Sequence, residues 1–304
     1  MKPIRLGTRS SALALWQAHW VQEQLQKLGV DVEVIHIKTQ GDVKSGPIGQ
    51  IGERGVFTKE IQRALLDRSI DLAVHSLKDM PTEAVPGLQI GAVPAREVNS
   101  DAFVSNSVAD LDSLPAGAKV GTGSNRRKAQ LLSLRPELDV QDIRGNVGTR
   151  LQKLDEGEYD AIILAEAGLR RLNLANRITQ LLPKDQMVPA VGQGALGLEV
   201  RDDDAATLQA ILPLNHFETY QGVMAERAML GALRGGCLAP VGAWARSEAG
   251  RLILDGVVLS TDGRVRLETH QEGPIDFAED LGEKAAIHLA DQGAREIIAA
   301  ERTS

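Results

Sequence analysis

The sequence contains a single cysteine, and its neighbours are unusual for a residue that only fills space. Cys237 lies in "LRGGCLAP", directly after Gly235 and Gly236. Glycines at such a place let a bulky group approach the backbone closely. Two interpretations stay open from these residues alone: a small buried hydrophobic side chain, or a thiol to which a group is attached. A single cysteine does exclude an internal disulfide and a thiolate metal cluster.

A charged pair follows an apolar run in "IDLAVHSLKDMP". Lys78 and Asp79 come where a predicted buried strand ends, which is where catalytic groups tend to lie in open α/β sheets. An ionised Asp79 near cations would suit the stabilisation of a developing positive charge. On this segment alone, an ion pair at a strand end explains the two residues equally well. His75 is interpreted as a core histidine and receives no role.

Arginines recur in three similar turns at predicted strand ends. The turns "GTRSS", "GTGSNRRKAQ" and "IRGNVGTR" contain Arg9, Arg126, Arg127, Arg144 and Arg150. Helix N-termini already carry positive potential, so a cation there is unfavourable unless an anion binds as well. The repetition favours carboxylate or phosphate binding over a solvated or domain-bridging role. Arg171, in "GLRRLNL", fits a surface role equally well.

The composition excludes several classes of function. A net charge of −7 and an aromatic content of 3% argue against nucleic-acid binding, which relies on positive fields and stacking surfaces. No apolar run could span a bilayer and the N-terminal residues lack a signal-peptide core, so we expect a cytoplasmic protein without membrane contact. The segment "GQGALG" matches a dinucleotide fingerprint by letters, but the strand-like run after it predicts a hinge or a close backbone approach instead.

Alternating segments must position these residues. Strand-like and helix-like runs alternate over the first two-thirds of the chain, which is typical of parallel α/β domains with crossover helices. After about residue 217, we predict a helix, the cysteine loop and three strands separated by turns at Ala249-Gly250 and Asp262-Gly263. A long amphipathic helix carrying Phe277, Leu281 and Leu289 would complete a small α+β domain.

Together these stretches resemble the porphobilinogen deaminase family. The resemblance covers essentially the whole chain in family order and includes "RLGTRSSALALWQA", "DLAVHSLKDMP", "VGTGSNRRKAQL", "IRGNVGTRLQKLDEGEYDAIILAEAGLRRL", "PAVGQGALGLE" and "GGCLAPVGAWA". It implies hydroxymethylbilane synthase activity, in which four porphobilinogen molecules condense head to tail with release of ammonia. The product is the linear tetrapyrrole hydroxymethylbilane, an intermediate of tetrapyrrole biosynthesis.

The resemblance also implies roles for individual residues. Cys237 would carry a dipyrromethane cofactor through a thioether, which would explain the two glycines beside it. Asp79 would assist loss of the amino group and stabilise the azafulvene cation that results. No metal and no nucleotide are expected. Cofactor and substrate carboxylates would be bound by Arg9, Ser11, Lys78, Thr122, Ser124, Arg126, Arg127, Arg144, Arg150, Arg171 and Gln193.

The family architecture agrees with the predicted segments. It implies two α/β domains of the type II periplasmic-binding-protein kind, which flank a cleft, and a small α+β domain with a three-stranded antiparallel sheet. We assign residues 1–96 and 195–214 to the first domain, 97–194 to the second and 215–304 to the third, with hinges near 95–100 and 189–194. A monomer is expected, and its product could pass directly to the next enzyme, uroporphyrinogen-III synthase.

The sequence departs from the family motifs at several positions. Gly123 and Asn125 stand where the family motif usually has Ser and Leu, Glu53-Arg54 replaces a common Gly-Lys, and Glu166 replaces a small or apolar residue. These departures concern individual contacts and leave Asp79 and Cys237 untouched.

The alternative function is a non-catalytic organic-anion binding protein with a hinged two-domain cleft. The missing export signal and the appended thiol-bearing domain disfavour it.

Overall fold

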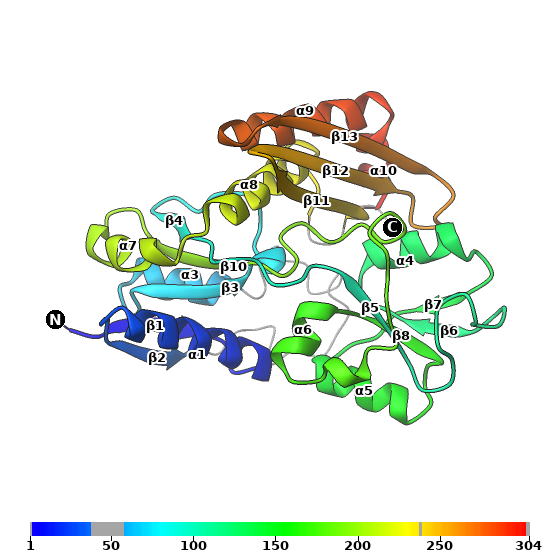
Figure 1. Cartoon of the computed structure of the whole chain (residues 1–304), viewed down its shortest axis with the longest axis horizontal. Helices are drawn as coiled ribbons and strands as arrows, with labels where there is room; N and C mark the ends of the chain where they lie inside the picture. The colour runs from blue at the N-terminus through cyan, green and yellow to red at the C-terminus, as the bar shows by residue number, and fades with distance from the viewer. Residues whose placement is uncertain (1, 38–57, 237–238, 302–304) are drawn as a thin grey trace. The chain divides into compact units, whose positions relative to one another are not determined.

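The computed structural model describes residues 2–37, 58–236 and 239–301, and the chain divides into two compact units (Figure 1). Unit 1 comprises Met1–Arg96 and Ala195–Tyr220, and unit 2 comprises Glu97–Gly194 and Gln221–Ser304. Cys237 and the Glu53-Arg54 pair lie outside the described residues. Across the described ranges, no helix combines the length and apolar character that a membrane span requires.

Unit 1 is built on a five-stranded sheet with the order β2-β1-β3-β10-β4. Strands β1, β2 and β3 run parallel, whereas β10 runs antiparallel to both β3 and β4. The strands are β1 (Ile4–Thr8), β2 (Val32–His36), β3 (Leu72–Ser76), β4 (Leu88–Ala92) and β10 (Leu196–Arg201). The helices are α1 (Ala12–Lys27), α3 (Lys59–Leu66), α7 (Ala205–Ile211) and the short 3-10 segments η1 (Leu77–Asp79) and η3 (Leu212–Leu214).

Helices cover both faces of this sheet. On one face, Val21 and Leu25 of α1 are fully buried in a cluster that includes Leu6 of β1 and Leu198 of β10. On the other face, Ile61 and Leu65 of α3 form a second buried cluster with strand residues. Because side chains alternate across the pleat, β3 contributes to both clusters, with Leu72 and Val74 in the first and Ala73 in the second. The ends of the strands are therefore held rigidly between two packed layers.

A carboxylate on the β3 side of the sheet joins two arginines. Asp71 Oδ1 accepts from Nη2 of Arg5 at 2.7 Å and from Nη2 of Arg201 at 3.1 Å, and Asp71 Oδ2 accepts from Nε of Arg5 at 2.9 Å. Burial alone would raise the pKa of the Asp71 carboxyl, but hydrogen bonds from Arg5 and Arg201, with the charge of Arg5, hold that pKa below its usual value. The ionised form of Asp71 thus stabilises the fold.

We expect Asp71→Asn to lower the free energy of unfolding by about 1–3 kcal/mol at pH 7, because charge-assisted hydrogen bonds to two arginines are lost. The folded-state pKa lies below the unfolded value of about 4, so the stabilisation is complete above that pH and disappears as the pH falls through the folded-state pKa. Urea denaturation at neutral pH and below pH ~4 checks this. An equal difference between variant and parent at both pH values would contradict it.

Unit 2 contains a second five-stranded sheet with the order β7-β6-β8-β5-β9. Strands β6, β7 and β8 are parallel, and β5 pairs antiparallel with β8 and β9. The strands are β5 (Asp101–Ser105), β6 (Lys119–Gly121), β7 (Asp139–Gln141), β8 (Ala161–Ala165) and β9 (Gln180–Leu181). The helices are α4 (Asn125–Leu134), α5 (Val147–Asp155), α6 (Glu166–Arg171) and the 3-10 segment η2 (Ala175–Arg177).

The C-terminal part of unit 2 is a three-stranded antiparallel sheet backed by helices (Figure 1). The elements are α8 (Phe217–Ala232), β11 (Val241–Glu248), β12 (Arg251–Leu259), β13 (Arg266–Pro274), η4 (Ile275–Phe277), α9 (Ala278–Asp291) and α10 (Ala294–Glu301). Met229 of α8, Leu289 of α9 and Ile298 of α10 pack into one buried cluster with strand residues. Ala129 of α4 packs in a further cluster with Val257 of β12, so helix α4 contacts the C-terminal sheet through buried side chains.

The α/β fold class and the C-terminal three-stranded sheet are confirmed, with two corrections. Both five-stranded sheets are mixed and not purely parallel, because β10 and β5 run against their neighbours. The C-terminal helix is also two helices: Gly293 adopts a positive φ of 100° between α9 and α10, and Phe277 lies before α9 with 59% of its surface exposed. The three domain boundaries remain a prediction.

Candidate active site

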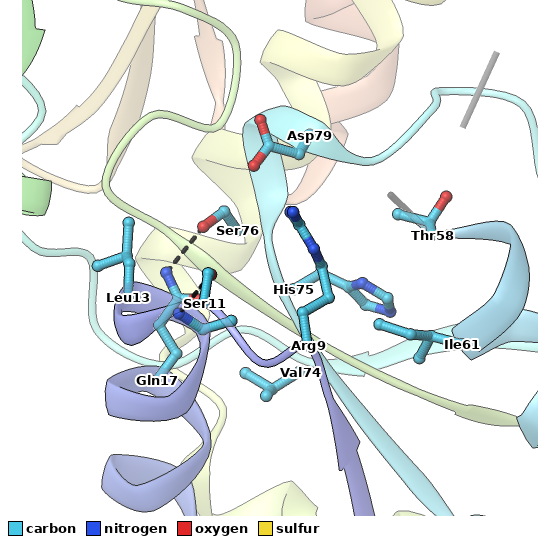
Figure 2. Close-up of a pocket in the computed structure, with 11 residues that line it drawn as sticks. Arg9, Ser11, Leu13, Gln17, Thr58, Ile61, Val74, His75, Ser76 and Asp79 are labelled. Atoms are coloured by element: carbon cyan, nitrogen blue, oxygen red, sulfur yellow. Dashed lines mark hydrogen bonds between the residues drawn. The ribbon is translucent and has the colours of Figure 1, made fainter. Parts of the chain in front are cut away.

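One pocket in unit 1 brings together three residues that the sequence singled out. Arg9, Ser11 and Asp79 line it with residues of α1, β3 and α3, and it encloses about 450 Å³ of empty space including its open mouth. Figure 2 shows the Arg9 side chain extending toward the chain segment that carries Asp79.

The topology of the sheet explains why these residues meet. Strands β1 and β3 are parallel neighbours, so their carboxyl ends lie at the same edge of the sheet. Arg9 directly follows β1, and η1 brings Asp79 directly after β3. Ser11 is the N-cap of α1, and its Oγ accepts a hydrogen bond from the Ala14 N–H at 3.4 Å. Both turns therefore project polar groups into one pocket.

The same pocket contains polar residues that sequence reasoning missed. Gln17, only 2% exposed, donates from Nε2 to Ser76 Oγ at 2.7 Å (Figure 2). His75 also lines the pocket, and its Nε2 lies 3.0 Å from Oε2 of the buried Glu199 on β10. Gln62 of α3 donates to the other oxygen of Glu199 at 2.9 Å. Glu199 is 124 residues from His75 in sequence, so no local pattern could have indicated this pair.

A second pocket, in unit 2, contains three further predicted residues. Thr122, Ser124 and Arg144 line it together with Gly123, Asn125, Lys128 and Asp142. Ser124 is the predicted N-cap of α4 and accepts from the Arg127 backbone N–H. Arg144 forms an ion pair with Asp142 at 2.7 Å. Lys128 and Asp142 were not singled out from the sequence, and the pocket therefore offers hydrogen-bond donors and charges of both signs.

Gly123 is explained by the space around it. A Cβ atom built on Gly123 would lie 3.0 Å from the carbonyl oxygen of Ile143, which is closer than side chains normally come to backbone. A serine at this position would require the neighbouring backbone to shift. This departure from the family motif therefore matches the local packing of this chain.

Three of the remaining predicted residues, all arginines, are buried and do not form a surface cluster. Arg126 and Arg127 are 3% and 6% exposed, and both contact the buried carboxylate of Asp101. Arg171 is also buried, and its Nη2 donates to the carbonyl oxygen of Gly194 at 2.7 Å. Burial lowers the pKa of the Arg171 guanidinium. The surface interpretation of Arg171 is therefore wrong.

Three predicted residues lie apart from these contacts or cannot be placed. Lys78 is half-buried in η1, but it does not belong to the lining of the unit 1 pocket. Arg150, in the first turn of α5, donates from Nε to the Gly145 carbonyl oxygen at 2.8 Å. Cys237 lies outside the described residues.

The segment "GQGALG" makes a close backbone approach, as predicted. Gly194 has a φ of +85°, and a Cβ atom there would lie 2.6 Å from the carbonyl oxygen of Glu97. Only glycine fits such a position without strain. Gln193, beside it, is completely buried and donates from Nε2 to the Asn99 carbonyl oxygen at 2.8 Å.

Two family profiles match consecutive parts of the chain. Residues 4–209 match the profile described as porphobilinogen deaminase, dipyromethane cofactor binding domain, and residues 220–291 match the porphobilinogen deaminase C-terminal domain. The chain belongs to the porphobilinogen deaminase family. A porphobilinogen deaminase from Desulforudis audaxviator (strain MP104C) is 49% identical over 304 residues, which covers 99% of this chain and 98% of that relative.

Two solved structures are similar to this chain at lower sequence identity. A periplasmic substrate-binding protein of an ABC transporter from Coxiella burnetii is 14% identical, with a TM-score of 0.45 over 74% of this chain and 96% of that chain. A nutrient binding protein from Burkholderia cenocepacia bound to methionine is 14% identical, with a TM-score of 0.43 over 75% of this chain and 94% of that chain.

Membership in the porphobilinogen deaminase family establishes the activity. The chain is a transferase of tetrapyrrole biosynthesis that forms hydroxymethylbilane from porphobilinogen and uses a dipyrromethane cofactor. The alternative of a non-catalytic anion-binding protein is not favoured.

Proposed function

We propose that the unit 1 pocket is where porphobilinogen loses its amino group, with Asp79 as the catalytic carboxylate and Arg9 as a binding group for a substrate carboxylate. One observation supports this most strongly: Arg9 and Asp79, which lie 70 positions apart in the sequence, line the same pocket. Ser11 adds a hydroxyl to that lining. A cation-binding carboxylate beside an anion-binding guanidinium matches a substrate that carries both an ammonium group and carboxylates.

The chemistry that Asp79 would support is charge stabilisation. When the protonated aminomethyl group leaves as ammonia, the positive charge that it carried stays on the pyrrole and its exocyclic carbon. A carboxylate near that charge lowers the free energy of the transition state. A pyrrole α-carbon then forms a bond to the exocyclic carbon and loses its proton, which balances the charge. Asp79 is exposed and lines the pocket, so its carboxylate is accessible to a substrate there.

Residues of unit 2 fit the anionic side chains of the cofactor. The buried Nε of Arg126 has no hydrogen-bond partner among the described residues, and buried donors of this kind normally have one. When bound, the dipyrromethane supplies the pyrrole to which new units are added. We assign its anchoring to Cys237 and the binding of its carboxylates and those of the growing chain to Lys78, Thr122, Ser124, Arg126, Arg127, Arg144, Arg150, Arg171 and Gln193.

We further propose that the protein is a cytoplasmic monomer. The net charge of −7 and the single cysteine are typical of a protein in a reducing compartment that does not bind nucleic acid. Direct transfer of hydroxymethylbilane to uroporphyrinogen-III synthase would protect a reactive product from water, and it is part of the same proposal.

The role of the unit 1 pocket is tested by Arg9→Gln. Loss of a charge-assisted contact to a substrate carboxylate should lower kcat/KM for porphobilinogen by about 10- to 100-fold, mainly through KM. Steady-state assays of ammonia release and of linear tetrapyrrole formation measure it. Arg5→Gln is the matched control, because Arg5 lies on β1, the strand that Arg9 directly follows, but is paired with Asp71 and does not line the pocket. Equal effects of the two substitutions would contradict the assignment.

A further inference from the structure

Asp101 is the first residue of β5 and lies between two arginine side chains of unit 2. Its Oδ2 is 2.8 Å from Nη1 of Arg126, and its Oδ1 accepts hydrogen bonds from Nε and Nη2 of Arg127 at 2.9 and 2.6 Å. Asp101 is 0% exposed, Arg126 3% and Arg127 6%. Three ionisable groups are thus held together away from water.

The charges of this cluster do not balance. Burial alone would raise the pKa of the Asp101 carboxyl, but the charges of Arg126 and Arg127 and the hydrogen bonds from Arg126 and Gln193 hold it well below its usual range. Asp101 is therefore ionised at neutral pH, and arginine side chains stay protonated in proteins. One carboxylate faces two guanidinium groups. A buried excess of positive charge is costly unless another anion approaches it.

Arg126 also has unused hydrogen-bonding capacity. Its Nη1 donates to the carbonyl oxygen of Val188 at 2.6 Å, but its buried Nε has no hydrogen-bond partner within the described part of the chain. Arg127 is better satisfied, since its Nη1 donates to the Ile163 carbonyl oxygen at 3.1 Å in addition to the contacts with Asp101. The unused donor lies on the arginine that has the single contact to Asp101. Charge and hydrogen bonding therefore both indicate an anion at Arg126.

Asp101 also joins the two crossover segments that lie within unit 2. Gln193 donates from Nε2 to Asp101 Oδ1 at 3.0 Å and to the Asn99 carbonyl oxygen at 2.8 Å. Residue 99 belongs to the segment that enters β5, and residue 193 belongs to the segment that returns after β9. The side chain of Gln193, on the returning segment, therefore links the Asp101 carboxylate to the backbone of the segment that enters β5.

We propose that Asp101 is a positioning residue that serves as the resident counter-charge of Arg126 and Arg127. It holds the two guanidinium groups together in protein that has not yet acquired its cofactor. It leaves one positive charge and the Nε–H of Arg126 for a cofactor carboxylate. This inference rests on the proposed function, which assigns cofactor binding to the two arginines. It adds the residue that makes such a site compatible with a folded, unloaded protein.

The inference predicts an energetic coupling between Asp101 and the cofactor. Without Asp101, two guanidiniums would be buried with no internal anion, so the unloaded protein should suffer most and cofactor carboxylates should compensate in part. An ion pair that only stabilises the fold would contribute equally to the stability of the protein with and without cofactor. The coupling therefore separates the proposed role from a structural one.

The test compares thermal unfolding of unloaded and loaded full-length protein. Unloaded protein is prepared from a host that cannot make porphobilinogen, and loading with porphobilinogen is verified by intact mass. In Asp101→Asn we expect the rise in Tm on loading to be about twice that of the parent protein. Asp71→Asn is the matched control, because Asp71 also joins two arginines but lies in unit 1 outside the pocket lining. The rise in Tm of Asp71→Asn on loading should equal that of the parent protein.

An equal rise in Tm on loading for Asp101→Asn and the parent would overturn the inference. An enlarged rise in Tm for Asp71→Asn would overturn it as well. A parent protein that gains no mass on incubation would instead overturn the proposed function. If unloaded Asp101→Asn cannot be isolated folded, Asp101→Asn/Arg126→Gln reduces the buried positive charge again. We expect this double variant to yield folded unloaded protein. A double variant no more stable than Asp101→Asn would refute the counter-charge role.

Discussion

Cys237→Ala is expected to fold like the parent protein, carry no added mass and form no linear tetrapyrrole. The sequence contains no other cysteine, so no second thiol could form the thioether that the proposed function requires. A thiolate is a far stronger nucleophile than any hydroxyl or amine nearby at neutral pH. Intact-mass spectrometry of the parent should show the added mass of two linked pyrroles, and the variant should show none.

Cys237→Ser provides the stricter comparison, because it preserves the size of the side chain and changes only the attacking atom. We expect it to resemble Cys237→Ala in mass and activity. Circular dichroism, and a thermal midpoint equal to that of the unloaded parent protein, exclude a folding defect as the cause. A parent protein that turns over porphobilinogen with an unmodified mass would refute the anchoring role of Cys237.

The sequence was sufficient to predict much of the fold and the place of the unit 1 site. A helix that begins just after Arg9, the strand that ends before Asp79, and the turn at Ala249-Gly250 all follow from local patterns. The structure reproduces them, including positive φ angles of 49° and 76° at that turn. Parallel β1 and β3 then bring Arg9 and Asp79 to one edge, which is a property of the fold class.

Strand direction was less accessible from the sequence. Buried strands read as continuous apolar runs whichever way they run, so nothing in "LGLEVR" or "DAFVS" indicates that β10 and β5 are antiparallel to their neighbours. The direction follows from where the chain returns after an excursion through other elements. The same limit applies to the C-terminal helix, where Gly293 lies inside an apolar pattern that continues on both sides.

The environment of the arginines depends on tertiary contacts. Arg126 and Arg127 read as polar residues in the first turn of a helix, but both are buried against the carboxylate of Asp101, which lies 26 positions before Arg127 in the chain. The motif "DAFVS" looked like an ordinary strand because the partners of Asp101 are not local. The residue types predicted that Arg126 and Arg127 bind anions. Only the three-dimensional structure shows that the buried carboxylate of Asp101 lies between them.

Asp79→Asn is expected to retain the fold and the cofactor and to lower kcat by about 10²- to 10³-fold, the usual effect of removing one preorganised electrostatic group. The substitution is nearly isosteric and removes the charge that would stabilise the cation left by ammonia. Because Asp79 is exposed, its substitution should change stability little. Single-turnover measurements of ammonia release isolate the step concerned, and intact mass confirms that the cofactor is present.

Two further variants test whether the effect of Asp79→Asn comes from the charge at this position. Asp31→Asn makes the same chemical change at an exposed aspartate of unit 1 outside the pocket, and it should leave kcat unchanged. Asp79→Glu retains the charge but moves it by one methylene, so its activity should fall between that of the parent and Asp79→Asn. If the charge of Asp79 acts only on substrate binding, KM will rise at constant kcat. That result, or near-parental turnover in Asp79→Asn, would remove this carboxylate from the chemical step.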